Sequence, residues 1–256
     1  MIKTDGKIVH DDISKDVPGA YPWQYKEYDI RSLIFMPIEP DINLYWNERA
    51  IFRKGYNVDN NTKEIYIPNF FIKINGKHKN DKEYIEFVRF LMESKNTLVI
   101  NNKFDNNFPG YYLNLKNNEY SKSIKEYIEN CKFIDKKKDI VEQFVEYYFE
   151  KEKRNNKFSS IVYDKQLQIK KILINTIKKN IEIWKANDLD NLLEVYFNIP
   201  ESMAILINNF DYNYDIPKIV CLNVRFNKKD AYLINLLNEL AFDIIILDVT
   251  GKTTIE

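Results

Sequence analysis

The segment 45–56, Tyr-Trp-Asn-Glu-Arg-Ala-Ile-Phe-Arg-Lys-Gly-Tyr, concentrates residue types that suit the binding of an anion. Arg49 and Arg53 stand close in sequence to Trp46 and Glu48. A guanidinium group holds a carboxylate or phosphate through two parallel hydrogen bonds, so this set can form an anion or substrate site. The same residues can instead form an internal ion pair with a cation–π contact. Their spacing leaves both interpretations open.

A second group of polar residues follows two apolar runs near the end of the sequence. These runs, 218–224 and 242–249, have strand length and flank an amphipathic helix predicted over 228–240. Such a strand–helix–strand unit normally lies in a parallel sheet, whose ligands gather at the carboxyl ends of the strands. There the residues are Arg225, which can hold an anion, with Asp248 and Thr250, of which Asp248 can hold a ribose-like diol or a metal. The alternative is a set of solvated loop residues.

The small numbers of glycine, histidine and cysteine limit the possible cofactor chemistry. The sequence has 6 glycines, 2 histidines and 2 cysteines. A phosphate loop needs a glycine five residues before its second glycine, but position 246, five residues before Gly251, is isoleucine. The turn 224–229 contains no glycine, so its backbone cannot approach a pyrophosphate as a dinucleotide fingerprint does. The sequence therefore identifies no cofactor and no metal site.

Charge and hydropathy bound the partners and the compartment. Lysine and arginine total 38, and aspartate and glutamate also total 38, which argues against bulk electrostatic binding to nucleic acid or membrane. No apolar run approaches the ~18 residues of a membrane span. Cys131 and Cys221 lie far apart in sequence, which favours a cytoplasmic protein with reduced thiols. We expect no membrane partner and no nucleic-acid partner.

Two further features resemble functional sites but have simpler interpretations. His78 follows a turn and can act as a general base, but no Ser, Cys or carboxylate stands beside it in a recognised arrangement. We therefore interpret it as a solvated loop residue. The long helix predicted over 159–185 carries a basic face, which we interpret as solvated because the rest of the chain supplies as many acids. Its lysines are Lys165, Lys170, Lys171, Lys178, Lys179 and Lys185.

The elements that must position these residues indicate an α/β (or α+β) fold in four regions. We predict a polar tail at 1–20, an N-terminal region of mixed strands and helix at 21–118, a helical region at 119–210, and a Rossmann-like βαβ unit at 211–256. Strands are predicted at 32–38, 64–75 and 97–100, and further helices at 120–131, 141–148 and 200–208. The segment 41–55 is ambiguous.

One helix start is marked clearly. Asn80 followed by Glu83 resembles a capping box. Tyr84, Phe87 and Leu91 then recur at helical spacing, which predicts an apolar face. The preceding Asn75-Gly76 pair marks a turn at the end of the strand 64–75.

Three segments resemble the YceG-like family. The segment 45–56 resembles its W-x-E-x-A-x-x-R-x-G-aromatic stretch, and 67–76, which contains Lys73, resembles its P-x-x-F-x-K-I-x-G stretch. The end of the sequence, 236–256, resembles an L-G-F-D-V-hydrophobic strand followed by a [S/T]-G-Y-x-x-I-E ending. Two positions depart from the pattern, because Ala241 replaces a glycine and Lys252 replaces an aromatic residue.

The resemblance implies a cytosolic bacterial protein of a stress response. YceG-like proteins are associated with a biosynthetic module of tellurium-resistance (toxic-anion, Ter) operons. By this resemblance we expect an accessory protein that binds a small anionic or nucleotide-derived ligand. The alternatives are a non-enzymatic module that docks a protein from the same operon, and an enzyme of glycosyl- or phosphoryl-transfer type that uses Asp248 with a divalent metal.

The expected site residues form two surfaces. The first comprises Trp46, Glu48, Arg49, Arg53 and Lys73, and the second comprises Arg225, Asp248 and Thr250. If Arg49, Arg53 and Lys73 converge on an open cleft near the strand ends, ligand binding is favoured. If they are buried in ion pairs, the interaction module is favoured.

Overall fold

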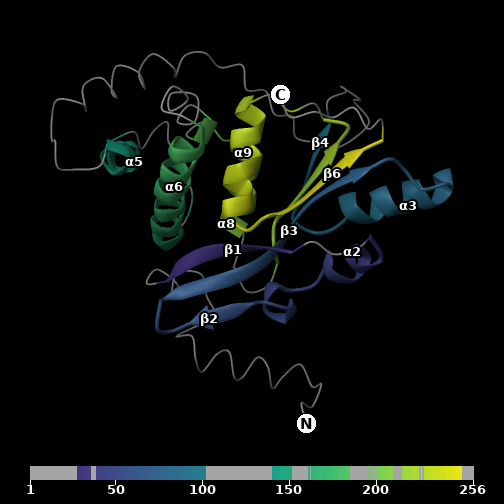
Figure 1. Cartoon of the computed structure of the whole chain (residues 1–256), viewed down its shortest axis with the longest axis horizontal. Coiled ribbons are helices and arrows are strands. Elements are labelled where there is room, and N and C mark those ends of the chain that lie inside the picture. Colours follow the sequence, from purple (N-terminus) through teal and green to yellow (C-terminus); the bar gives the residue numbers. More distant parts are fainter. Residues whose placement is uncertain are drawn as a thin grey trace, which may run out of the picture.

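A computed structural model shows one mixed sheet between two layers of helices (Figure 1). The structure describes residues 28–35, 39–101, 140–151, 161, 163–184, 195–196, 199, 201–209, 215–224, 226 and 228–249. The sheet has six strands in the order β1-β3-β6-β5-β4, and β2 pairs with the outer part of β3. The five strands of the main path are parallel, and β2 is antiparallel to β3. The fold is therefore α/β, as predicted.

The long strand β3 joins two parts of the sheet. It spans Glu64–Asn75 and pairs first with β1 (Asp29–Phe35) and β2 (Asn57–Asp59). From Phe71 onward its partner is β6 (Asp243–Asp248). Because every buried backbone group needs a hydrogen-bond partner, the change of partner at Phe70 must be completed by side chains.

The ambiguous segment 41–55 forms two short helices on one face of the sheet. The α-helix α2 spans Glu39–Tyr45, and the 3-10 helix η2 spans Ala50–Phe52. Neither is long enough to show a helical period in the sequence, which is why the pattern was indecisive.

The predicted helix start after the turn is confirmed. The helix α3 spans Asp81–Met92, and the side chain of its N-cap, Asn80, accepts a hydrogen bond from the amide of Lys82 at 2.9 Å. Glu83 receives the side-chain amide of Asn80 at 3.4 Å, in place of the backbone N–H of a complete capping box. After α3 the chain enters β4 (Thr97–Asn101).

The described part of the middle region is helical, as predicted. It contains α5 (Ile140–Lys151), α6 (Tyr163–Trp184) and α8 (Glu201–Asn209). The predicted tail 1–20 and the predicted helix 120–131 lie outside the described residues. None of the helices among the described residues is long and apolar enough to cross a membrane.

The final βαβ unit is confirmed. It consists of β5 (Lys218–Leu222), α9 (Lys228–Glu239) and β6, and the two strands are parallel neighbours. The helix α9 ends in a Schellman motif, in which the amide of Phe242 donates to the carbonyl of Leu237 and the amide of Ala241 to that of Asn238. Ala241 at the C′ position has φ +60°, the left-handed region that favours glycine. This explains physically why the resembling family pattern has glycine there.

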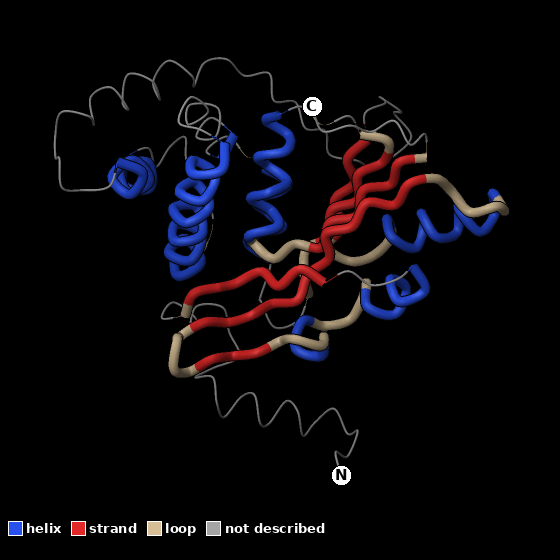
Figure 2. The backbone as a smooth tube through the Cα atoms, in the orientation of Figure 1, coloured by secondary structure: helices blue, strands red, loops and turns tan. Residues whose placement is uncertain are grey.

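Helices cover both faces of the sheet (Figure 2), and an apolar core lies on each face. The α9-side core contains residues of α6, α8 and α9, among them Leu173, Met203 and Leu236. The α3-side core is smaller and contains residues of α2, α3 and three strands: Ile42, Trp46, Phe70, Phe87, Leu91, Val220, Ile245 and Leu247. The helix after β3 thus covers one face, and the helix after β5 covers the other.

Candidate functional site

Arg53 lies buried at the amino end of β6, where it completes the junction in the sheet. Its side chain is 1% exposed and holds Asp243 through two bonds of 2.7 Å, Nη1 to Oδ1 and Nη2 to Oδ2. The same guanidinium donates to the carbonyls of Pro68 at 3.1 Å and Tyr45 at 2.8 Å. Asp243 Oδ1 also accepts the amide of Phe70 at 2.9 Å. Arg53 and Asp243 therefore satisfy backbone groups of β3 at its change of partner.

The aromatic residues around Arg53 are part of the α3-side core. The guanidinium lies 4.6 Å from the centroid of the Phe70 ring, which stacks at 6.3 Å on the ring of Trp46. Trp46 is fully buried, and its indole N–H donates to the carbonyl of Leu91 at 3.2 Å. The internal ion pair with a cation–π contact, left open by the sequence, is what the structure contains.

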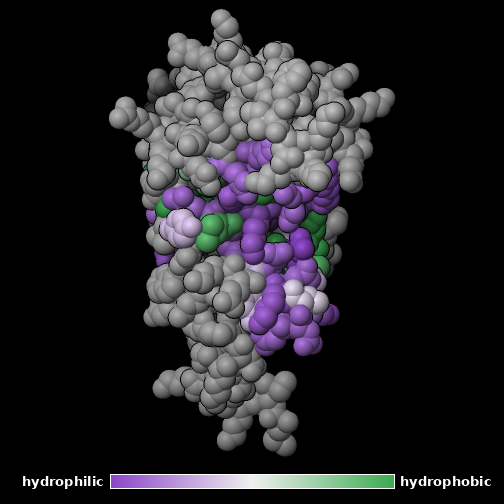
Figure 3. All heavy atoms as spheres, turned by 90° about the vertical axis from the view of Figure 1, so that its left-hand side faces the viewer, coloured by the Kyte–Doolittle hydropathy of each residue, from purple (hydrophilic) through white to green (hydrophobic). Residues whose placement is uncertain are grey.

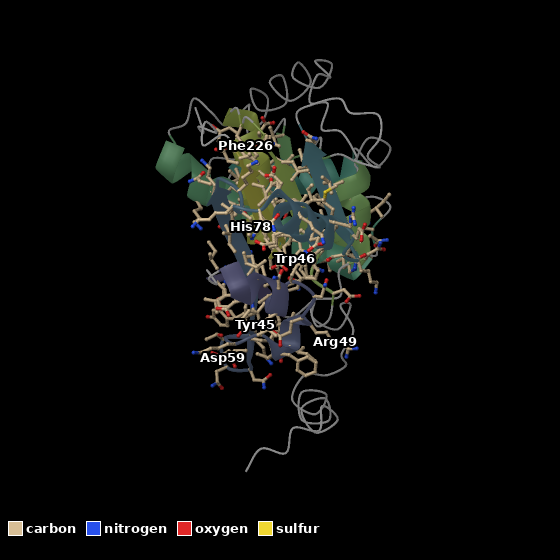
Figure 4. The ribbon with its side chains drawn as sticks, turned by 90° about the vertical axis from the view of Figure 1, so that its right-hand side faces the viewer. Tyr45, Trp46, Arg49, Asp59, His78 and Phe226 are labelled. Carbon is tan, nitrogen blue, oxygen red and sulfur yellow. The ribbon has the colours of Figure 1, made fainter. Side chains whose placement is uncertain are left out.

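Glu48 and Arg49 do not join Arg53 in an open cleft. Glu48 is partly buried, and burial raises the pKa of its carboxyl group while the charge of Arg53 lowers it to a smaller extent. Arg49 is exposed and lies apart from His78, as Figure 4 shows. The expectation that Trp46, Glu48, Arg49, Arg53 and Lys73 form one surface is therefore wrong. Lys73 lies five residues beyond Pro68 on β3, about 16 Å away at ~3.3 Å per residue.

Lys73 lies instead beside Asp248, at the carboxyl end of β6. The Lys73 ammonium is 3.5 Å from Asp248 Oδ2, and the two side chains are 38% and 0% exposed. Lys73 belongs to the first predicted surface and Asp248 to the second, so one residue of each surface contacts the other between the paired strands β3 and β6. Arg225 and Thr250 lie outside the described residues.

The loops that leave β3 and β5 hold the end of β6 from both sides. The amide of Gly76 donates to the carbonyl of Asp248 at 2.8 Å, and the amide of Asn223 donates to that of Leu247 at 2.8 Å. The side chain of Asn223 accepts the amide of Val249 at 3.0 Å. Gly76 and Asn223 both have positive φ, +92° and +49°. Gly76 adopts this conformation without steric cost because it has no Cβ, and Asn is the side chain that tolerates the left-handed region best.

A pocket of about 100 Å³ lies at this edge of the sheet, between β3, β6 and α3. Its apolar walls are Ile74, Phe87 and Leu247. The remaining lining residues are Asn75, Gly76, Lys77, His78 and Tyr84. An apolar pocket with a few polar groups is the usual form of a small-molecule site.

The aromatic side of the pocket is built by His78 and two residues of α3. The imidazole of His78 lies edge-on to Phe87, with ring centroids 5.5 Å apart, and 6.2 Å from the ring of Tyr84. Burial raises the pKa of the Tyr84 hydroxyl, and Lys77 opposes this shift. The hydroxyl therefore stays protonated at neutral pH and can donate a hydrogen bond. The interpretation of His78 as a merely solvated loop residue is incomplete, because the ring packs against α3.

Several pocket residues were not among the predicted site residues. Tyr84, Phe87 and Leu247 look like core positions in the sequence, because an apolar wall of a pocket and a core share one hydrophobic period. Gly76 has a signal in the sequence, the Asn-Gly turn, but this signal by itself predicts only the end of a strand.

The basic face of α6 is neutralised by carboxylates of neighbouring elements. Four of its lysines pair with acids at 2.7 to 3.9 Å: Lys170 with Glu146, Lys171 with Asp29, Lys178 with Glu142 and Lys179 with Glu239. Lys165 is buried and donates to the carbonyls of Ile207 and Asn208. The described surface in Figure 3 is mostly hydrophilic. Among the described residues, no group of three or more His, Cys, Asp or Glu could hold a metal ion.

These features define a three-layer α/β domain with a pocket at the carboxyl ends of parallel strands. The chain belongs to the YceG domain family, whose pattern matches residues 39–256. It is similar to a protein of Bacillus subtilis (strain 168) described as uncharacterized protein YceG, with 25% identity over 244 residues. That alignment covers 92% of this chain and 42% of the relative, so the chain spans less than half of the relative's length. No solved structure matches the chain.

Proposed function

We propose that this chain is a small-molecule-binding domain, with its ligand at the carboxyl ends of β3 and β6. The ligand is a small anionic or nucleotide-derived metabolite, and the protein is a cytoplasmic accessory component of a Ter-type stress-response module. The resemblance to YceG-like proteins is the basis for the module, and the geometry of the sheet supports the position of the site.

The observation that carries this proposal is the divergence of the connections around β6. The chain leaves β3 toward α3 on one face and leaves β5 toward α9 on the opposite face, and β6 lies between these strands. In open α/β sheets, ligands bind in the crevice that such a divergence opens at the carboxyl ends. The pocket lined by Ile74, His78 and Leu247 lies at this end.

The dimensions of the pocket restrict the group that enters it. A cavity of ~150 Å³ lined by apolar residues holds one benzene molecule. At about 100 Å³ and partly open to solvent, this pocket suits a single small ring or a compact group and leaves the rest of the ligand outside. We therefore expect a one-ring base to fit better than a purine.

The interaction module and the transfer enzyme remain predictions. Arg53 is buried in an ion pair, which favours the interaction module, while Lys73 lies at the strand ends and supports a ligand site. We therefore assign the two residues to different roles, Arg53 to the fold and Lys73 to the site.

Titration calorimetry with defined probes tests the proposal. The probes are uridine monophosphate, adenosine monophosphate and ribose phosphate, applied to the whole chain. We expect uridine monophosphate to bind most tightly and His78→Ala to weaken it by about threefold to tenfold, the size of an aromatic edge contact. The control is Tyr163→Ala, which removes a 69% exposed ring on α6, in the opposite helical layer.

Amide chemical shifts locate the binding. Uridine monophosphate should shift the amides of Gly76 and Val249 in the wild-type chain and in the Tyr163→Ala variant. Equal affinity of the wild-type and His78→Ala proteins, or shifts confined to other segments, would contradict a site at this edge.

A further inference from the structure

The two faces of the sheet meet different parts of the candidate site. Alternate residues of a strand point to opposite faces. Ile74 and Leu247 belong to the α3-side core, whereas Phe71 and Ile246 belong to the α9-side core. Lys73 lies two residues after Phe71 on β3, and Asp248 lies two residues after Ile246 on β6. The side chains of Lys73 and Asp248 therefore lie on the α9 face of the sheet. The pocket and the Lys73–Asp248 pair thus lie on opposite sides of one strand end.

The charge of Lys73 is fixed in place and still reaches solvent. Its partner Asp248 is fully buried, and the backbone at Asp248 is held by Gly76. The lysine side chain itself is 38% exposed. An ammonium carries three N–H donors, which suits it to contact a ligand oxygen while it remains paired with a carboxylate.

We propose that Lys73 is the specificity residue for an anionic group of the ligand, with Asp248 as its positioning residue. The ligand lies across the edge of the sheet, with its ring in the pocket on the α3 face and its anion at Lys73 on the α9 face. This inference rests on the proposed function. It adds a chemical class, a one-ring head joined to a phosphate or carboxylate by a spacer of sugar size.

The spacing follows from the layers. Packed layers stand ~10 Å apart, and each group stands about half that distance from the plane of the sheet. The ring and the anion are therefore separated by on the order of 10 Å. A free phosphate or a bare aromatic ring reaches only one of the two positions.

Lys77 offers a second position for the anion, which the test must separate from Lys73. Lys77 lines the pocket and pairs at 2.5 Å with Asp81, whose side chain is 73% exposed. An anion at Lys77 would lie beside the ring on the same face. Only an anion bound at Lys73 requires a ligand that extends across the edge of the sheet from one face to the other.

The experiment compares uridine monophosphate with uridine on the whole chain by titration calorimetry. In the wild-type protein we expect the phosphate to improve affinity by about tenfold, the effect of one charge-assisted contact in a partly exposed site. Lys73→Met should abolish this ratio and leave the affinity for uridine unchanged. Lys77→Met and Lys179→Met should retain the ratio. Lys179 is the matched control, a 59% exposed lysine that pairs with Glu239 near the other end of β6.

The two proposals fail in different ways. If Lys77→Met abolishes the ratio and Lys73→Met does not, the ligand stays on the α3 face and the inference is overturned. The inference is also overturned if uridine and uridine monophosphate bind equally to the wild-type protein while His78→Ala weakens both. If neither probe shifts the amides of Gly76 and Val249, the proposed function itself fails. Circular dichroism of each variant confirms that it is folded.

Discussion

The two ends of β6 carry two ion pairs that look alike in the sequence and differ in the structure. Each joins a basic residue of the N-terminal part to an aspartate of the last strand, Arg53 to Asp243 and Lys73 to Asp248. The first pair is bidentate at 2.7 Å and almost fully buried. The second has one contact of 3.5 Å and a lysine that reaches solvent.

The difference shows how one strand can separate stability from function. A buried guanidinium that also bonds backbone carbonyls can hardly release them to a ligand without breaking the sheet junction. Lys73 is partly exposed and holds Asp248 through one contact of 3.5 Å, so its ammonium can also meet a ligand without breaking a backbone bond of the sheet. We therefore assign Arg53 and Asp243, at the amino end of β6, to folding, whereas the proposed binding site lies at the carboxyl end.

The largest expected effect on the free energy of unfolding comes from a change at the amino end of β6. Arg53→Met leaves the Asp243 carboxylate buried without its charge partner, and we expect a loss of about 3–5 kcal/mol in the free energy of unfolding. Urea denaturation measures it. Arg53→Lys should recover little, because an ammonium cannot reproduce the two parallel bonds.

A double variant sharpens this result. Arg53→Met combined with Asp243→Asn removes both charges, while the Asn side chain can still accept the amide of Phe70. It should be more stable than the single variant Arg53→Met. If Arg53→Met alone unfolds within about 0.5 kcal/mol of the wild-type protein, a surface-like value, the contrast between the two ends is lost.

Left-handed residues stand beside both ends of β6 and give the next effect. Ala241, before the strand, has φ +60°, and Asn223, beside its end, has φ +49°. Ala241→Gly should stabilise the chain by about 1 kcal/mol, because glycine takes this conformation without a Cβ clash. Asn tolerates the left-handed region, and Asn223 also bonds Val249, so Asn223→Gly should not stabilise. Thermal unfolding of both variants measures the difference, and an Ala241→Gly protein that melts lower contradicts the account.

The sequence predicts the elements better than the site, for physical reasons. The strands at 64–75 and 242–249, and the helix that starts at Asn80, are fixed by local hydrophobic period and capping. The pairing of Arg53 with Asp243 depends on residues 190 positions apart, which no local pattern encodes. Likewise, nothing in the spacing of Arg53 and Lys73 tells that the two residues lie at opposite ends of β6.

The family resemblance points to segments of the sequence without fixing what each residue in them does. It marked Trp46 and Arg53 as ligand residues, whereas the structure buries both in the fold. Lys73 and Asp248, from segments far apart in the sequence, do meet. A short motif of arginine, glutamate and aromatic residues can serve a junction in a sheet as well as a binding site, so the motif alone cannot separate the two.

A smaller effect tests the carboxyl end. Lys73→Met should lower the free energy of unfolding by at most about 1 kcal/mol, well below the loss for Arg53→Met. It leaves the buried Asp248 carboxylate without its charge partner, but the pair has one contact of 3.5 Å and its lysine is partly exposed. Urea denaturation beside the Arg53→Met variant gives the comparison directly. A loss near that of Arg53→Met would show that the Lys73–Asp248 pair stabilises the fold as strongly as the Arg53–Asp243 pair.

The smallest effect concerns Glu48, near Arg53, whose pKa is raised by burial. Because the folded state binds this proton more tightly than the unfolded state, stability falls as pH rises through the window above the ordinary glutamate value of ~4.3. Glu48→Gln removes the titration. The stability of this variant relative to the wild-type protein should therefore be greater at pH ~7 than at pH ~4.

Urea midpoints of both proteins at the two pH values measure this change, and Glu93→Gln, an exposed carboxylate on the α3 C-cap, gives the baseline. A relative stability that is larger at the acidic value would mean that the attraction of Arg53 outweighs burial at Glu48. Glu48 would then be a second carboxylate that attracts Arg53 at the amino end of β6. The contrast between this end and the single Lys73–Asp248 pair at the carboxyl end would become sharper.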